Sequence, residues 1–95
     1  MPRRRAITDA QLQALLALPT TEPDLIRHYT LGPADLAVIA RRRRPHNRLG
    51  FAIQLCALRF PGRLLSPGEV VPRQVLVFIA EQLDVDPDTL ENYAT

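Results

Sequence analysis

One segment of the chain, from His46 to Phe60, constrains the fold more than any other, because its pattern is that of a helix apolar nearly all round. At roughly 100° per residue its apolar side chains fall into two stripes. These are Leu49, Ile53, Cys56 and Phe60, and then Phe51, Leu55 and Leu58. Other elements must cover such a helix, so we predict that it is the buried centre of the domain, with Cys56 as plain core. Only its first turn and a line through Arg48, Ala52 and Arg59 are expected to be free for a ligand.

Proline and capping residues divide the rest of the chain into short helices. Thr8 and Gln11 match a capping box, and Pro33 and Pro72 stand where a helix begins. Further helices are predicted at about 9–18, 21–28, 33–43, 72–83 and from 87 onward. No β-hairpin signal or internal repeat competes with them. The expected fold is therefore all-α, a compact bundle of about six short helices containing a helix-turn-helix. Residues 1–6 are expected to be a basic flexible arm, and residues 7–95 one helical domain.

Helical periodicity also assigns inward contacts. Leu25 is expected to face inward from the second helix, and Leu36, Ile39 and Ala40 from the third. Arg43 falls on the same side as Leu36 and Ile39, so it is expected to be the structural member of its arginine run. On the fifth helix the inward residues are Val75, Leu76, Ile79 and Leu83. The five Phe and Tyr residues lie at helical apolar spacing, which favours core over a base-stacking platform.

Charge is unevenly distributed, although the formal total is only +2. Residues 1–65 carry eleven arginines against four acids, whereas residues 66–95 carry one arginine against six acids. The modest total therefore hides a strongly basic face, which favours a polyanionic partner such as nucleic acid. The acidic C-terminal third would then face away from that partner, or toward a copy of the chain or another domain.

The strongest basic feature is the run Arg41–Arg44, followed directly by Pro45. Each guanidinium can form a fork with two phosphate oxygens and displace counterions. Proline biases the preceding residue toward extended backbone, so the chain must turn at Arg44 before the next helix begins. In a helix-turn-helix the first residues of the second helix meet base edges. Here these are His46, Asn47 and Arg48. The Asn side chain can pair with adenine and the Arg side chain with guanine. The residues expected to read bases therefore directly follow the arginines expected to bind phosphates.

No pattern for catalysis or metal binding stands out. His28 and His46 lack a third ligand at metal-site spacing. The Asp-x-Asp-x-Asp string at 84–88 suggests calcium, but Pro87 stands where an EF-hand loop would not allow it, and helix capping explains these acids. The chain also lacks a nucleophile elbow, a Gly-rich phosphate loop and an HExxH motif. We therefore predict no catalytic residue, no metal and no cofactor.

Three stretches are similar to a known family: RHYTLGPADLAVI, RRRRPHNRLGFAIQLCALRFPGR and PGEVVPRQVLVFIAEQLDVDP. From about Ile7 to Tyr93 the chain resembles the N-terminal domain of the Tn-three family of replicative, cointegrate-forming bacterial transposases. The elements HNRLGFAIQLC and RFPG are specific to this resemblance. It implies a helical region that binds the double-stranded terminal inverted repeats of a transposon, with the catalytic acidic triad far downstream. By position it implies DNA contact around Arg41–Arg44 and at His46, Asn47 and Arg48.

The N-terminal arm adds three arginines with nothing apolar to anchor them. They are either a tail without a role or an arm that enters a neighbouring minor groove. The complete set of candidate DNA-binding residues is Arg3, Arg4, Arg5, Arg41, Arg42, Arg44, His46, Asn47, Arg48 and Arg59.

Two other interpretations stay open. The bundle could be a protein-interaction domain, whose basic face docks an acidic partner and whose acidic third contacts its own transposase or a second copy. Because the transposases it resembles continue far beyond this length, the chain would be an excised domain or a truncated product. A truncated product could repress transposition by occupying the transposon ends. The sequence shows neither a membrane-spanning run nor a secretion signal, so a place in the bacterial cytoplasm is expected.

Overall fold

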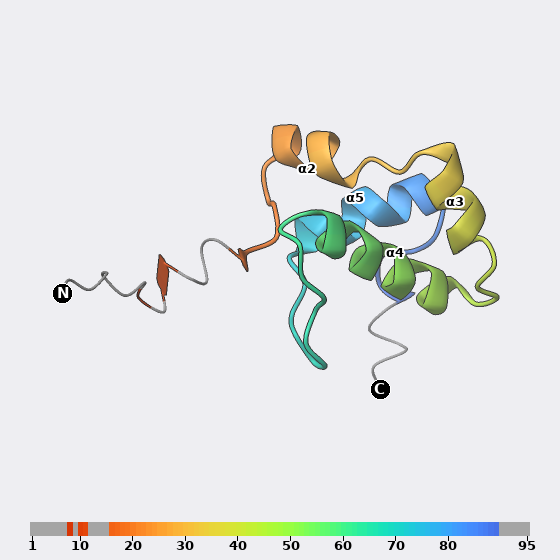
Figure 1. Cartoon of the computed structure of the whole chain (residues 1–95). Coiled ribbons are helices and arrows are strands. Elements are labelled where there is room, and N and C mark those ends of the chain that lie inside the picture. Colours follow the sequence, from red (N-terminus) through yellow and green to blue (C-terminus); the bar gives the residue numbers. More distant parts are fainter. Residues whose placement is uncertain (1–7, 9, 12–15, 90–95) are drawn as a thin grey trace.

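Four helices make up the described part of the chain, which comprises residues 8, 10–11 and 16–89 of a computed structural model. They are α2 (Glu22–Tyr29), α3 (Pro33–Ile39), α4 (Pro45–Arg59) and α5 (Arg73–Leu83), as Figure 1 shows. These residues contain no strand, so the all-α prediction is confirmed for them. The first and last predicted helices lie largely outside them. Thr8 and Gln11 do exchange the two hydrogen bonds of the predicted capping box, at 2.9 and 3.1 Å.

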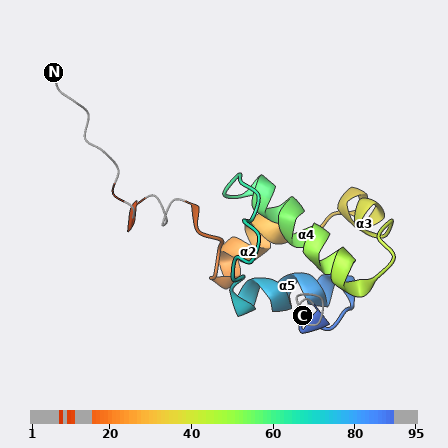
Figure 2. The same cartoon turned by 90° about the horizontal axis from the view of Figure 1, so that it is seen from below.

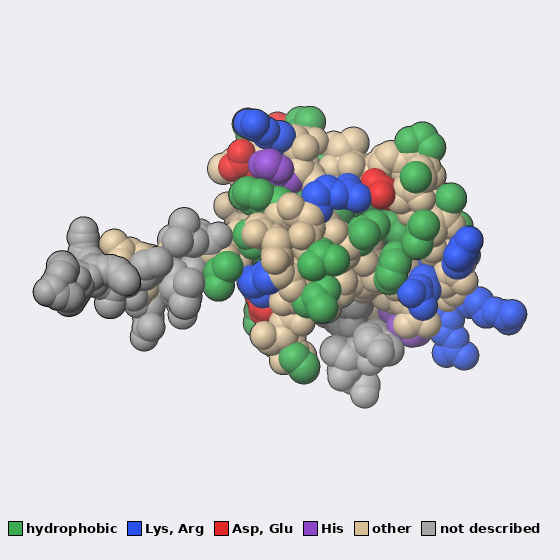
Figure 3. Space-filling view, in the orientation of Figure 1, with side chains coloured by type: hydrophobic (Ala, Val, Ile, Leu, Met, Phe, Trp, Pro, Cys, Tyr) green, Lys and Arg blue, Asp and Glu red, His purple; other side chains and the backbone are tan. Residues whose placement is uncertain are grey.

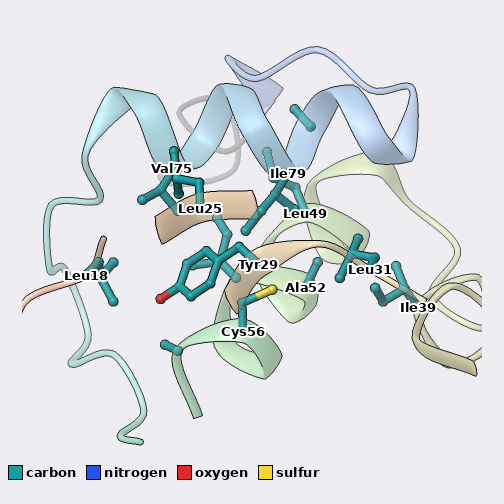
Figure 4. Close-up of a cluster of buried hydrophobic side chains, with 13 residues drawn as sticks. Leu18, Leu25, Tyr29, Leu31, Ile39, Leu49, Ala52, Cys56, Val75 and Ile79 are labelled. Atoms are coloured by element: carbon teal, nitrogen blue, oxygen red, sulfur yellow. The ribbon is translucent and has the colours of Figure 1, made fainter. Parts of the chain in front are cut away.

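The helix predicted to be central, α4, is so in the structure. α5 packs along it most extensively, α2 contacts both of these helices, and α3 contacts α4 (Figures 1 and 2). The buried side of α4 consists of Leu49, Ala52, Ile53, Cys56 and Ala57. Val75 and Ile79 of α5 and Tyr29 of α2 complete this core, and none of the three has any exposed surface (Figure 4). The stripe through Ile53 and Cys56 was thus assigned correctly from periodicity.

Two polar side chains satisfy backbone groups at the edge of the core. The Tyr29 hydroxyl donates a hydrogen bond of 2.7 Å to the carbonyl of Phe60. Burial raises the pKa of Tyr29 well above its ordinary value. The Gln82 amide accepts from the N–H of Leu31 (2.8 Å) and donates to the carbonyl of Tyr29 (2.9 Å). The end of α2 is therefore tied to both α4 and α5.

Several expectations about exposure are wrong. Ala52, expected on a free line of α4, is fully buried. Leu58 and Leu36, expected to face apolar neighbours, are 55% and 39% exposed. The apolar surface of α4 is larger than the other described helices cover, so its outer side, with Phe51 and Leu55 half-buried, faces solvent. We call Phe51, Leu55 and Leu58 the outer stripe.

α3 is shorter than predicted, because it ends at Ile39 and not near Arg43. Pro45 holds Arg44 in an extended conformation (φ −103°, ψ 147°), which prevents a helix from running into α4. Adjacent cations within one helical turn also repel one another. Arg43 is exposed as a result, and the prediction that it packs beside Leu36 and Ile39 is wrong.

The connection between α4 and α5 is fastened by an ion pair. The Arg63 guanidinium makes two hydrogen bonds to the Glu69 carboxylate (2.9 and 2.7 Å), and its Nε donates to the carbonyl of Leu16 (2.9 Å). Arg63 lowers the pKa of Glu69 to about 2, helped by the N–H of Ser66. This loop, which projects below α4 in Figure 1, leaves Val70 87% exposed.

Candidate nucleic-acid interface

The four consecutive arginines form one exposed connection between α3 and α4, which we call the arginine loop (residues 41–44). All four side chains are exposed. They border an open hollow of about 590 Å³, whose remaining lining comes from Asn47 and Phe51 of α4. In Figure 3 basic side chains gather at the end of the molecule where α3 meets α4. The loop therefore has the charge and the shape to accept a polyanion.

Contacts with α4 hold the arginine loop in place. The Nε of Arg48 donates a hydrogen bond of 2.8 Å to the carbonyl of Arg42. The guanidinium carbon of Arg42 lies 4.4 Å from the centroid of the Phe51 ring, a cation–π arrangement. Behind the loop, the N–H of Arg41 bonds to the carbonyl of Val38 (3.2 Å). These contacts place the loop against the first turns of α4.

The first turn of α4 places Asn47 beside the arginine loop. Its exposed side chain lines both the basic hollow and a second groove of about 600 Å³, which lies between α4 and residues 65–71. His46 is half-buried and lines the second groove. The helix N-terminus adds its own partial positive charge and N–H groups. The structure therefore brings the loop arginines, Asn47 and Arg48 together, with His46 on the neighbouring groove.

Arg59 lies apart from this group. Its guanidinium makes two hydrogen bonds to the Asp35 carboxylate (2.8 and 3.2 Å), which also accepts the N–H of Gly32 at the start of α3 (2.9 Å). The Arg59 guanidinium and the Gly32 N–H lower the pKa of Asp35. Arg59 is also about 16 Å from Arg48 along the helix axis. With Ala52 buried between them, the predicted free line is absent, and Arg59 braces α3 against α4.

Arg3, Arg4 and Arg5 lie outside the described residues, so their role as an arm stays a prediction. Within the described ranges no group of three or more His, Cys, Asp or Glu side chains is placed to hold a metal ion. Among the same residues, no helix is both long and apolar enough to cross a membrane.

Sequence reasoning missed several contacts that shape this surface. Phe51 was assigned to the core, against which it packs, but its contact with Arg42 was not predicted. The pairing of Asp35 with Arg59 and the stacking of His28 on Phe60, with centroids 3.9 Å apart, were not foreseen either. These partners come from different elements. Helical spacing relates residues within one helix, so it carries no signal for them.

Comparison with known proteins places the chain in a family. Residues 7–95 match the family described as Domain of unknown function (DUF4158). The chain is 44% identical over 93 residues to the transposase for transposon Tn501 of Pseudomonas aeruginosa, and 47% identical over 93 residues to the transposase for transposon Tn21 of Escherichia coli. Each alignment covers 98% of this chain but only 9% of the relative. The chain therefore belongs to the DUF4158 family, and nearly its whole length is similar to transposases of the Tn-three family, as its motifs predicted.

Proposed function

We propose that this domain binds double-stranded DNA at the terminal inverted repeats of a transposon, as the N-terminal module of a transposase. The observation that carries the proposal is the arginine loop, four consecutive exposed arginines directly before the first turn of α4. The similarity to transposases over 98% of the chain supports it, since a transposase acts on the DNA of its transposon. The domain positions DNA and performs no chemistry. Catalysis and any cofactor it needs belong to the rest of the transposase.

Affinity comes from Arg41, Arg43 and Arg44. Their exposed guanidiniums can each form a fork on phosphate oxygens, while the guanidinium of Arg42 lies against the Phe51 ring. Three phosphate contacts would release condensed counterions and give log K a salt slope of about −2.7. The N-terminus of α4 adds a favourable site for a fourth phosphate oxygen.

Specificity comes from the first turn of α4. Asn47 is exposed beside the loop and can pair with the N6 and N7 positions of adenine. The Nε of Arg48 is hydrogen-bonded to the Arg42 carbonyl, which leaves the two terminal guanidinium nitrogens of Arg48 to contact a guanine. The position of these nitrogens therefore depends on the position of the arginine loop. His46 contacts a phosphate or a base from the neighbouring groove. Because the inner side of α4 is core, the helix enters the major groove by its first turn and not lengthwise.

The test is a binding titration of the 95-residue chain at several salt concentrations. One duplex carries the terminal inverted repeat of the transposon that encodes the chain, and the other is a shuffled sequence of the same length. We expect tighter binding to the repeat, and Arg43→Gln should reduce the salt slope on both duplexes by about 0.9. Arg27→Gln, which removes an exposed arginine from the last turn of α2, is the matched control and should leave the slope unchanged. Equal affinity for both duplexes, or a preference for single strands, would refute the proposal.

A protein-interaction role is the second candidate, because apolar side chains are exposed on α3 and α4. Val38 and Leu58 are 42% and 55% exposed, and the outer stripe runs along α4 from Leu58 to Phe51, which lies beside the arginine loop. Such a surface suits contact with the rest of a transposase or with a second copy, and a truncated product with this surface could act as a repressor. If it is an interface between copies, sedimentation should show association that Leu58→Glu abolishes, with DNA affinity unchanged. A monomer at all concentrations removes self-association from consideration.

A further inference from the structure

Two kinds of contact fasten the arginine loop to α4: the backbone N–H of Arg48 bonds to the carbonyl of Arg44 (2.9 Å), and Arg42 makes the contacts that involve side chains. The carbonyl of Arg42 accepts the hydrogen bond from Arg48 Nε (2.8 Å), and its guanidinium lies 4.4 Å from the Phe51 centroid. We propose that Arg42, Arg48 and Phe51 form a clasp that holds the loop in its DNA-binding conformation. Phe51 is then a positioning residue for DNA that does not itself touch DNA. This inference rests on the proposed DNA-binding function and assigns a new role within it.

The clasp answers a physical problem in the loop. Four adjacent guanidiniums repel one another, which favours a disordered loop. If the loop became ordered only on binding DNA, the free-energy cost of ordering it would reduce the affinity. A cation over the face of an aromatic ring is attracted to it, so Phe51 can fix one of the four charges without a carboxylate. A carboxylate at this place would repel phosphate, whereas a ring does not. The clasp thus orders the loop without adding an acidic side chain to the lining of the hollow.

The clasp also relates the loop to the residue proposed to read bases. Asn47 and Phe51 are four residues apart on α4, so they lie on the same face of the helix, and both line the basic hollow. Fixing Arg42 on Phe51 therefore fixes the loop relative to Asn47. A loop that moved independently of α4 would let phosphate contacts form in several registers, of which only one places Asn47 at its base pair.

A purely structural role for Phe51 predicts a different outcome. Phe51 is half-buried and packs at the margin of the core, so its ring could contribute to stability alone. Phe51→Leu keeps an apolar side chain there and removes only the ring. If Phe51 is only packing, this variant changes stability and leaves DNA binding as it was.

The test compares Phe51→Leu and Phe51→Tyr, which keeps the ring, with the wild-type chain. The control is Leu58→Ala, an exposed apolar change two turns further along the same helix. On the terminal-repeat duplex, loss of the ring should weaken binding about two- to fivefold, the range expected for an exposed cation–π contact. The salt slope should not change, because no phosphate contact is lost. Phe51→Tyr should bind like wild type. In the free protein, amide hydrogen exchange at Arg41 and Arg42 should be faster in Phe51→Leu.

A double-mutant cycle separates the clasp from a direct DNA contact by Phe51. In an Arg42→Gln background, Phe51→Leu should cause no further loss of affinity, because the clasp is already open. A full additional loss in that background, an altered salt slope, or wild-type affinity for Phe51→Leu would overturn the inference. Faster amide exchange with unchanged affinity would overturn it while the DNA-binding function stands. If the wild-type chain binds neither duplex, the function itself fails, and the inference falls with it.

Discussion

Replacing Asp35 tests whether Arg59 is a brace between α3 and α4. The Asp35 carboxylate accepts one hydrogen bond from the Gly32 N–H and two from Arg59, and the two side chains are 20% and 40% exposed. Asp35→Ala loses the capping hydrogen bond, about 0.5 to 1.5 kcal/mol, and a solvent-screened ion pair, about 0.2 to 1 kcal/mol. The total is about 0.7 to 2.5 kcal/mol, which lowers the Tm of a domain this size by about 3 to 20 °C.

Arg59→Ala isolates the ion pair. It should cost only about 0.2 to 1 kcal/mol, and in an Asp35→Ala background it should cost almost nothing further. Thermal unfolding followed by far-ultraviolet circular dichroism measures both effects. DNA titration is the second assay, and Arg59→Ala should leave the salt slope unchanged. A wild-type Tm together with a slope reduced by about 0.9 would show that Arg59 is a phosphate contact, as its sequence position predicts.

The same pair gives stability a pH dependence. The pKa of Asp35 is lowered in the folded protein by Arg59 and the Gly32 N–H. The contribution of the Asp35 carboxylate to the stability of the fold is therefore fully present above the ordinary carboxyl pKa of 3.8. It is lost as the pH falls through the lowered pKa. The Tm difference between wild type and Asp35→Asn should be constant near neutral pH and should narrow in acid. A difference that widens in acid would contradict the pairing.

Three further predictions concern the core and the connection between α4 and α5. Burial raises the pKa of Cys56 to about 11, so iodoacetamide should modify it slowly in the folded protein and quickly in denaturant; rapid native labelling would show an accessible thiol. Arg63→Ala should raise the pKa of Glu69 from about 2 toward its ordinary value in an NMR titration, and an unchanged value would mean that Arg63 is not the cause. Tyr29→Phe should cost about 1 to 3 kcal/mol in denaturant unfolding, because the Phe60 carbonyl loses its donor; an unchanged midpoint would argue against that hydrogen bond.

Helix starts and the buried side of α4 could be predicted from the sequence because their causes are local. Proline and capping residues act within one turn, so Pro33 marks the first residue of α3 correctly, and α4 begins at Pro45, one residue before the predicted His46. Periodicity likewise identified Leu49, Ile53 and Cys56 as buried. The basic cluster was also visible, since consecutive arginines remain neighbours in any backbone conformation.

The errors have non-local causes. The helical phase assigned to Arg43 failed because α3 stops four residues earlier, where a charge run meets an extended residue before proline. The pairing of Arg59 with Asp35 and the contact of Phe51 with Arg42 were not predicted, because these partners come from other elements. A periodicity argument shows which side of a helix is apolar. It does not show which neighbour approaches that side, and that neighbour decides whether an arginine is available to a ligand.

The burial of α4 limits how this domain can meet DNA. A recognition helix that lies lengthwise in the major groove needs a polar outer side, but the outer stripe of α4 is apolar, and its inner side is core. Its polar and exposed N-terminal end is the part that can enter a groove, and the arginine loop stands directly before that end. Phosphate contacts made there orient the helix end toward the bases, and the clasp fixes the loop to the helix. Under the proposed function, affinity and specificity therefore depend on one corner of the fold, and Leu58 of the outer stripe stays available for a protein contact while DNA is bound.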